Sequence, residues 1–598
     1  MAVNPSWDPL RSPYAPFLDT NYAASPSERL GLQAFLSEPE QELSHLDSEI
    51  SRTEALLDEL RAQRDQVKTF VYAHRALMAP IRRLPAETLA EIFVHCLPTD
   101  RYPWRTVKEA PLLLTMVCRE WRDIAIKIPS LWNSFHIHIV SEPTLRCWEK
   151  GIAGWIARSA VLPLHVSLCI KKIRPILMNE ASILRTLMKF SFRFREAAFD
   201  LDALFLLMLD RYFPLTFPML ESLSISIPNS NSRDTLTAIP LVGPPYLELP
   251  MLQRLSINGF AQQTHTRSTR EWANITELIL ESTHPHTGLP LDQILGILGQ
   301  TTKLKTCCIS ISDSAQQMTP VNLPSLHSLW IRFDNTDQPW NAEISFRIIK
   351  DSFHALNCPS LKVLSVTWQK TSLKLDMVDY YLAFTHLLCS IHTLRLEFPM
   401  TSEALIKCLE LAQNLAVLEI IDCVHLLRPS ALPGRNHYYY QFQDSLLGKL
   451  TDTSTSAHLS PVLCPHLETL RYIIHQSYEA PDMSGLNGVS TLALLEFMES
   501  RCISNNRIRK LKVCDVILPP DAQPTDVGLF ERLRKLQDGM RVRVLYSELQ
   551  GMYYLPDVLD TNSPLLSLNF FPPLHQYILN NYTLTNTEAY VDNIGCSS

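Results

Sequence analysis

Glycine is scarce in this chain of 598 residues, with only 16 glycines. Neither GxGxxG nor GxxxxGK[ST] occurs, so the sequence offers no phosphate-binding loop of either kind. The HExxH and GxSxG patterns of zinc proteases and serine hydrolases are also missing. We therefore expect a chain that carries no cofactor and no catalytic residue.

The sequence has 14 cysteines but no CxxC pair, which disfavours a zinc ribbon or finger. A disulfide framework is not expected in so long a chain, so we interpret the cysteines as reduced and mostly buried. Neither a signal-peptide pattern nor an apolar run of about 18 residues occurs. These features predict a cytoplasmic or nuclear protein, or one found in both compartments, without a membrane segment.

Excess positive charge is lacking as well, because the net charge is −7. We therefore expect no nucleic-acid partner. The basic run 507–512 alternates with apolar residues, which is typical of a solvated strand face. A nuclear-localisation signal or a patch for an acidic partner is the alternative for this run.

Hydrophobic residues make up 46% of the chain and charged residues 19%, as in a folded protein. A chain of this length exceeds one hydrophobic core, so several domains or a repeating architecture are expected. Prolines interrupt residues 1–39, which predicts a flexible arm. These prolines are Pro5, Pro9, Pro13, Pro16 and Pro26.

Residues 40–77 carry a heptad pattern that predicts one long helix. Leu43, Ile50, Leu57, Arg64 and Val71 form one set, and a second set follows three residues later at Leu46, Thr53, Leu60, Val67 and His74. One interpretation is an amphipathic helix packed on its own protein. The other is a coiled coil over 43–74 that forms a homodimer or binds another partner.

Residues 78–134 predict a small group of helices with well-marked ends. Pro85 suits a first helical turn, and Pro98 ends the helix that follows. The apolar residues of that helix share one face: Leu89, Ile92, Phe93 and Leu97. A second helix after Pro111 is expected to line one face with Leu114, Val117, Cys118 and Trp121.

This segment resembles the F-box. The matching residues are Leu84-Pro85-x-Glu87-x-Leu89-x-x-Ile92-Phe93, Val117-Cys118-Arg119-x-Trp121-Arg122 and Leu131-Trp132. With the preceding heptads, the arrangement is similar to that of fungal F-box proteins. The resemblance implies a three-helix motif that binds the Skp-type adaptor, and through it a cullin, in a Skp–cullin–F-box (SCF) ubiquitin ligase.

Within this motif we expect the adaptor to contact an apolar helix face. The residues expected at that contact are Leu84, Pro85, Leu89, Ile92, Phe93, Leu97, Val117 and Cys118, with Trp121 and Trp132 in the motif's core. The connection Pro98–Glu109 is longer than is usual, so it either bulges harmlessly or alters the adaptor contact. The alternative for the whole segment is a helical hairpin packed on its neighbour in the chain.

Residues 135–550 repeat the pattern Leu-x-x-Leu-x-apolar, often after a proline, with helical segments between. This resembles a divergent leucine-rich repeat and predicts an irregular α/β solenoid, with an insertion at about 424–460. Separate small α/β domains are the alternative. Residues 551–598 are expected to form either a cap at the end of the solenoid or a C-terminal tail. Helices are expected at 291–298, 344–356, 380–390, 402–411 and 491–502.

Histidines at two places could suggest a metal site. His136 and His138 share one face of an alternating segment, and His284 and His286 flank a proline. No third ligand is identifiable, so we interpret these histidines as solvent-facing. Cys118 and Cys307 are interpreted as core residues and not as nucleophiles.

The leading hypothesis from the sequence is a substrate-recruiting SCF subunit with an unknown target protein. The alternative is a coiled-coil and leucine-rich-repeat scaffold that does not engage the ubiquitin machinery. A third hypothesis is an enzyme with an unrecognised site in the insertion or the C-terminal region.

Overall fold

The computed structural model describes most of the chain, and the chain divides into two units, Met1–Leu89 and Ala90–Ser598. The expected cap or tail 551–598 and the pair His284 and His286 lie outside the described residues. The described ranges are 12–18, 20–170, 177–201, 217–227, 249–259, 272–281, 288–313, 319–333, 342–368, 380–398, 400–423, 425–427, 437–439, 442–451, 462–475, 489–502, 507–518, 529, 532, 535–536 and 540–546.

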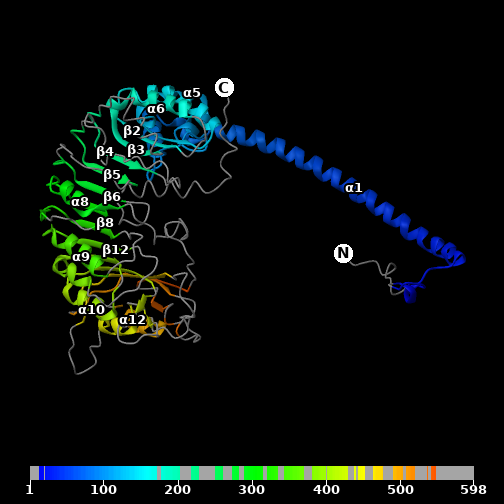
Figure 1. The fold of residues 1–598 in the computed structure, drawn as a ribbon. Helices are drawn as coiled ribbons and strands as arrows, with labels where there is room; N and C mark the ends of the chain where they lie inside the picture. The colour runs from blue at the N-terminus through cyan, green and yellow to red at the C-terminus, as the bar shows by residue number, and fades with distance from the viewer. Residues whose placement is uncertain are drawn as a thin grey trace. The chain divides into compact units, whose positions relative to one another are not determined.

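One long helix, α1 (Pro26–Leu77), follows the short turn η3 (Ala15–Phe17) in the first unit (Figure 1). The expectation of a flexible arm up to residue 39 is wrong for residues 26–39, which are helical. The helix starts early because Ser25 and Glu28 form a capping box and Pro26 occupies the first turn. The ring of Pro39 lies inside α1, where it removes one backbone hydrogen bond. No residue of α1 is buried.

Short helices follow α1. The turn η4 (Pro80–Arg83) precedes α2 (Ala86–His95), and α3 (Leu112–Val117) and α4 (Arg119–Lys127) come after the connection 98–109. The predicted second helix is broken at Cys118, whose backbone is extended. The extended residue caps α4, because the Cys118 Sγ accepts a hydrogen bond from the Trp121 N–H at 3.4 Å. The turn η5 (Pro129–Leu131) ends this segment.

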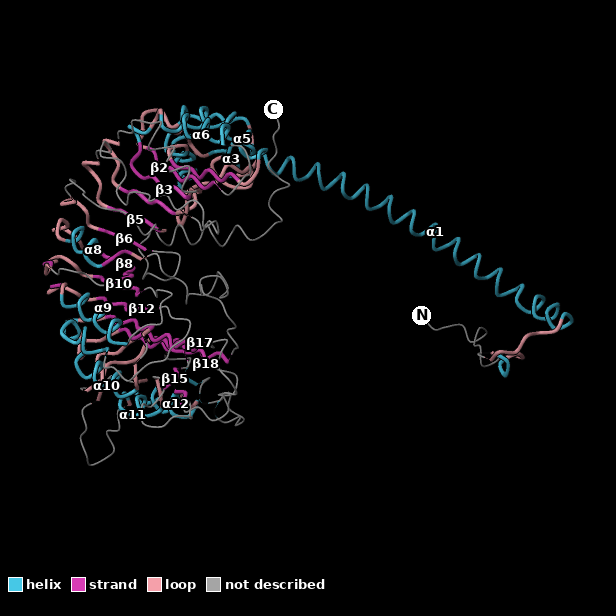
Figure 2. The backbone as a smooth tube through the Cα atoms, viewed as in Figure 1, coloured by secondary structure: helices cyan, strands magenta, loops and turns pink. Residues whose placement is uncertain are grey.

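A large parallel sheet dominates the rest of the described chain, and the strands along its main path pair in chain order (Figure 2). The strands in order are β1 (Ser134–Ile139), β2 (Leu164–Ile170), β3 (Phe194–Asp200), β4 (Ser222–Ser226), β5 (Arg254–Asn258), β6 (Glu277–Glu281), β8 (Thr306–Asp313), β10 (Ser328–Phe333), β12 (Val363–Trp368), β13 (Thr393–Glu397), β14 (Val417–Cys423), β17 (Thr469–His475), β18 (Val513–Leu518) and β19 (Arg541–Tyr546). A long helix followed by an α/β region with parallel strands was predicted, and the structure confirms that order.

The register aligns the Leu-x-x-Leu-x-apolar cores into rows that run across the strands. One row is fully buried and consists of Leu278, Cys307, Leu329, Leu364, Leu394, Leu418, Leu470 and Cys514. A side chain of this size contributes about 1.5–3 kcal/mol when it is fully buried. Because alternate residues of a strand face opposite sides, the leucine row fixes one face of the sheet as core.

The described helices after α4 are α5 (Glu142–Arg158), α6 (Leu177–Met188), α8 (Leu291–Leu298), α9 (Ala342–His354), α10 (Ser402–Leu411), α11 (Asp444–Leu450) and α12 (Thr491–Ser500). Helices cover the apolar side of the sheet, and α8, α9 and α10 lie on the same side of the strands (Figure 1). The bounds of α8, α9, α10 and α12 match or nearly match the predicted segments 291–298, 344–356, 402–411 and 491–502.

Two expectations in this region differ from the structure. The segment 380–390 forms two 3₁₀ turns, η7 (Tyr380–Ala383) and η8 (Thr385–Ser390), and not an α-helix. The expected insertion 424–460 contains α11, whose leucines are buried, so this part belongs to the core. The remaining short elements are η6 (Ser191–Arg193), β7 (Leu289–Pro290), β9 (Val321–Asn322), β11 (Leu356–Asn357), β15 (His425–Leu427) and β16 (His437–Tyr439).

Candidate functional site

Helix α3 exposes an apolar face, which we call the α3 patch. It consists of Leu113, Met116 and Val117, whose exposed fractions are 43%, 60% and 55%. The three residues share one face because they are spaced i, i+3, i+4. Leu114 on the same helix is buried, so α3 is apolar on both sides. A small helix that exposes three large apolar side chains together is typical of a contact surface for another molecule.

The residues expected at the adaptor contact fall into three groups by exposure. Leu89 and Phe93 are buried, while Leu84 and Leu97 are half-buried. Pro85, Ile92, Val117 and Cys118 are exposed, and Ile92 reaches 39%. Leu113 and Met116 were not among the expected residues. Their position beside the expected Val117, in a run of apolar residues after Pro111, is the signal that could have identified them.

The two tryptophans expected in the core occupy different environments. Trp132 is fully buried, and its indole N–H donates a hydrogen bond to the Ala125 carbonyl at 2.9 Å. Its ring packs edge-on against Trp155 of α5 with the ring centroids 4.9 Å apart. Trp121 is half-buried and lies 4.8 Å from the Phe93 ring between centroids. Aromatic packing therefore joins α2 to α4 through Phe93 and Trp121. It also joins the residue after η5, Trp132, to Trp155 of α5.

The long connection Pro98–Glu109 packs onto the beginning of the sheet. The His136 N–H of β1 donates a backbone hydrogen bond to the Pro103 carbonyl at 2.9 Å, and Arg101 forms an ion pair with Glu109 at 2.6 Å. The Arg105 guanidinium donates a hydrogen bond to the Cys147 carbonyl of α5 at 2.9 Å. This connection was expected to bulge or to alter the adaptor contact. Its described contacts are with the sheet and with α5.

Glu196 on β3 contacts the same connection through a network of hydrogen bonds and ion pairs. Its carboxylate accepts a hydrogen bond from the Tyr102 hydroxyl at 2.7 Å and pairs with His165 at 3.1 Å and with Arg254 at 2.6 Å. The hydrogen bond from His165, with those charges, lowers the pKa of Glu196 to about 2. The connection is thus tied to β3 and β5 as well as to β1.

His136 is buried, so its interpretation as solvent-facing is wrong. Its Nδ1 lies 2.9 Å from the Ser167 hydroxyl, and the Trp104 ring packs 5.0 Å from the His136 ring between centroids. Burial, with His138 and Arg101 nearby, lowers the pKa of His136 to about 3. A histidine held neutral in this way serves the packing of the connection on β1.

Charged residues form a row on the opposite face of the sheet from the leucines. The residues are register partners on neighbouring strands of the sheet, and positive and negative charges alternate along the row. They are Arg395, Glu419, Arg471, Asp515 and Arg543. Arg471 pairs with Glu419 and lies 3.7 Å from Asp515. Burial raises the pKa of Asp515, against the influence of the neighbouring arginines. We call these five residues the charge row.

Sequence reasoning missed the charge row, although a signal for it was present. Each member stands between the two apolar residues that end a strand core, as Arg395 does between Leu394 and Leu396. Aligning the cores one above another would have brought the alternating charges into one column. Alternation of this kind opposes a slip in strand pairing, because a shifted strand would lose its partners.

Among the described residues, no group of three or more His, Cys, Asp or Glu is placed to hold a metal ion. Cys307 is buried, and burial raises the pKa of its thiol. Cys118 is exposed, so its interpretation as a core residue is wrong, and its role is to cap α4.

Comparison with known proteins gives no family for this chain. No protein-family model matches the sequence, and no curated protein matches it. Among the described residues, the helices are either too short or too polar to cross a lipid bilayer.

Proposed function

We propose that this chain is the substrate-recruiting, non-catalytic subunit of an SCF ubiquitin ligase. The observation that carries the proposal is the α3 patch, an exposed apolar surface within the segment whose sequence resembles the F-box. A Skp-type adaptor would cover this patch and the exposed Ile92 of α2. Burying such side chains against a partner gives about 25 cal/mol for each Å² of apolar surface removed from water.

The buried residues of the motif take a different role in this proposal. Leu89 and Phe93 are covered by the chain itself, so they support the helices and do not touch the adaptor. The proposed adaptor contact therefore does not include the buried face of α2. It consists of α3, Ile92 and the residue before α4, Cys118, which is exposed. Packing of the connection 98–109 on the sheet supports an accessible α3.

The sheet region is proposed to be an irregular leucine-rich repeat that binds the target protein. Strand pairing in chain order and the buried leucine row support this proposal. The target would meet the face of the sheet that carries the charge row. Catalysis would belong to other subunits, and this chain would raise the effective concentration of target lysines near the charged ubiquitin carrier. We propose a cytoplasmic or nuclear location, where such ligases would act on their targets.

The proposal is tested by mixing the purified full chain with a Skp-type adaptor and measuring complex formation by size exclusion. The test variant is Met116→Asp/Val117→Asp, which places two charges on the α3 patch. We expect the wild-type chain to elute with the adaptor and this variant to elute alone. Phe93→Asp is not a suitable variant, because it would place a charge in the core and unfold the motif.

The matched control is Val161→Asp/Met251→Asp, which changes the same two residue types at exposed positions outside the motif. It should bind the adaptor as the wild type does, and circular dichroism should show all three proteins folded. A wild-type chain that is folded and fails to bind the adaptor would contradict the proposal.

A scaffold without adaptor binding is the second candidate function. The observation that favours it is that no residue of α1 is buried, so this helix offers a second surface for partners. If the folded chain fails to bind the adaptor and still self-associates through α1, the scaffold becomes the better account.

A further inference from the structure

Helix α1 exposes an apolar seam that no part of the described chain covers. The seam residues after Pro39 include six exposed large side chains: Leu43, Leu46, Ile50, Leu57, Leu60 and Val67. Exposed apolar side chains repeated at heptad spacing favour pairing with another helix. The charges beside the seam determine which helix can pair with it.

Charges that flank the seam are segregated along α1. The positions that follow the second set of seam residues are acidic in the first half of the helix, at Glu40, Asp47 and Glu54, and basic in the second half, at Arg61, Lys68 and Arg75. The flanking positions on the other side are Glu42 and Glu49, and then the uncharged Leu56, Gln63 and Phe70. A helix with one acidic half and one basic half complements a reversed copy of itself.

We propose that α1 forms an antiparallel coiled coil with α1 of a second copy of this chain. A parallel pair would place Glu42 near Asp47 and Glu49 near Glu54 of the second copy. It would also place Arg64 against its own counterpart inside the seam. Like charges in such positions are unfavourable, so the parallel arrangement is rejected.

One antiparallel register matches the seam residues by polarity. In this register Leu57 meets Leu60 of the second copy, and Thr53 meets Arg64, so two of the three polar seam residues share one layer. The other layers pair Leu46 with Val71, Ile50 with Val67 and Leu43 with His74. Shifting the register by one heptad places Arg64 against Leu60 or Leu46 and breaks this matching.

The same register brings opposite charges together beside the seam. Glu40 faces Arg75, Asp47 faces Lys68, and Glu54 faces Arg61 of the second copy. By symmetry each pair occurs twice, and no flanking pair joins like charges. Apolar matching and charge matching are independent properties of the sequence, and both select the same register.

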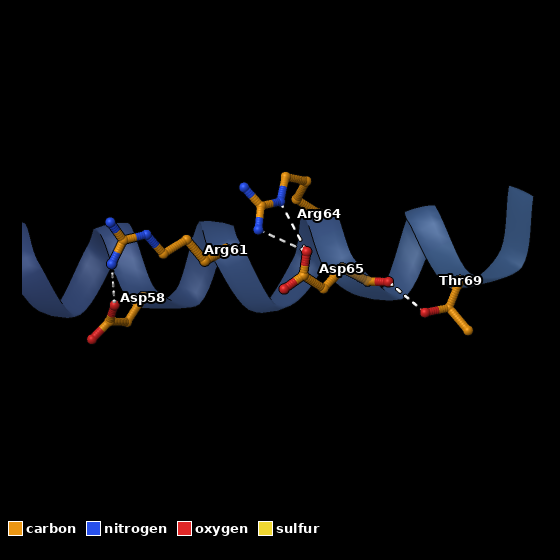
Figure 3. Close-up of polar contacts among 5 residues, drawn as sticks. All are labelled: Asp58, Arg61, Arg64, Asp65 and Thr69. Atoms are coloured by element: carbon orange, nitrogen blue, oxygen red, sulfur yellow. Dashed lines mark hydrogen bonds and ion pairs between the residues drawn. The ribbon is translucent and has the colours of Figure 1, made fainter. Parts of the chain in front are cut away.

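The basic residues already have local partners that the second copy could replace. Arg61 forms an ion pair with Asp58 at 3.2 Å, and Arg64 pairs with the adjacent Asp65 at 2.7 Å (Figure 3). All four side chains are more than half exposed, so these pairs are weak and exchangeable. Thr69 also bonds within α1, to the Asp65 carbonyl at 2.8 Å, and lies outside the seam (Figure 3).

Antiparallel pairing has a consequence for the segment that follows α1. The two copies of Leu77, where α1 ends, would lie at opposite ends of the pair. At a rise of about 1.5 Å per residue they would be roughly 55 Å apart along the axis. The segments that follow α1 in the two copies would therefore begin at opposite ends of the pair.

The orientation is tested by carbodiimide coupling of the native full-length chain. Asp47 and Lys68 lie three heptads apart on one helix, about 30 Å, so a covalent link between them requires two copies. We expect mass spectrometry to identify the Asp47–Lys68 peptide in the dimer fraction. A dimer that gives no such link would overturn the antiparallel register.

Self-association is tested by sedimentation equilibrium. The variant Arg61→Glu/Lys68→Glu makes the flank acidic along most of its length, and we expect its dimer dissociation constant to rise at least about tenfold. The control Arg29→Glu/Arg52→Glu has the same change of net charge on α1 outside the paired flank and should dimerise normally. A wild-type chain that stays monomeric at micromolar concentration would overturn the proposal and would leave adaptor binding unaffected.

Discussion

Leucines differ in exposure between helix α1 and the region of strands and helices from β1 to β19, which we call the strand–helix region. The seam leucines of α1 are exposed, whereas those of the aligned row in the sheet are fully buried. Both regions repeat apolar residues at a regular spacing, of seven residues in α1 and of three and two residues in each strand core. The difference is that these strands pair with neighbouring strands of the same chain, while the seam side chains of α1 are exposed. Regular apolar spacing therefore identifies a contact surface, and the neighbouring sequence decides whether that contact lies within the chain.

Arg501 provides the strongest test of how much the strand–helix region depends on buried contacts. It is fully buried at the end of α12, and its guanidinium donates hydrogen bonds to the carbonyls of Leu450, Leu463 and Cys464 at 2.9–3.1 Å. Arg501→Met would leave these carbonyls without their donor and should lower the free energy of unfolding by about 4 kcal/mol. Urea denaturation measures the change.

The control for Arg501 is Arg532→Met, because Arg532 pairs with Glu499 of α12 at the surface at 2.7 Å. An exposed pair contributes at most about 1 kcal/mol. Equal effects of the two substitutions would contradict the structural role assigned to Arg501.

Matched truncations of one leucine in each region compare them directly. Leu364→Ala removes a fully buried side chain from the leucine row and should cost about 2–5 kcal/mol. Leu57→Ala, on the exposed seam of α1, should change the unfolding of the sheet by less than about 0.5 kcal/mol. Tryptophan fluorescence during urea denaturation reports both, and a large effect of Leu57→Ala on that transition would show that α1 belongs to the core.

The pH dependence of stability tests the buried His136. Unfolded histidine has a pKa of about 6.5, and burial lowers the pKa of His136 to about 3 in the folded protein. Between these values the unfolded state binds the proton and the folded state does not, so stability falls as the pH falls. The loss from His136 should reach about 2 kcal/mol at pH 5.

His136→Gln should remove this part of the pH dependence, whereas His45→Gln on the exposed α1 should retain it. Thermal unfolding of the three proteins from pH 8 to pH 5 gives the comparison. Identical pH profiles for the wild type and His136→Gln would contradict the burial of this side chain.

The smallest expected effect concerns the cap of α4. Sulfur is a weak acceptor, so Cys118→Ser should strengthen the hydrogen bond from the Trp121 N–H and raise stability by about 0.5 kcal/mol. Cys96→Ser, which changes another exposed thiol, should be neutral. A loss of stability in Cys118→Ser, measured by thermal unfolding, would argue against the capping role.

Most of the fold could be predicted from periodicity, because local spacing determines it. The leucines at Leu329 and Leu364 follow strand spacing, and α8 and α10 have the predicted bounds. The start of α1 was missed because prolines usually disfavour helices, whereas Pro26 occupies a first turn and is compatible with one. The break at Cys118 was missed because its neighbours all fit a continuous helical pattern.

Less of the candidate site could be predicted, since exposure depends on contacts between distant segments. Helical spacing placed Ile92 and Phe93 on one face, but only Ile92 is exposed. Burial of His136 arises from the connection 98–109, through Trp104, and no local pattern near His136 indicates it. Met116 was overlooked because α3 is apolar on both sides, so its helical spacing does not distinguish core from surface.

The central claim is that the exposed apolar face of α3 binds a partner outside the chain. Its most direct test is a calorimetric titration of the full chain with a Skp-type adaptor, beside Met116→Asp/Val117→Asp and its control. The account predicts saturable binding with a negative heat-capacity change for the wild type and the control, and at least about tenfold weaker binding for the variant. Equal affinity in all three proteins would contradict the claim, because the adaptor would then bind elsewhere.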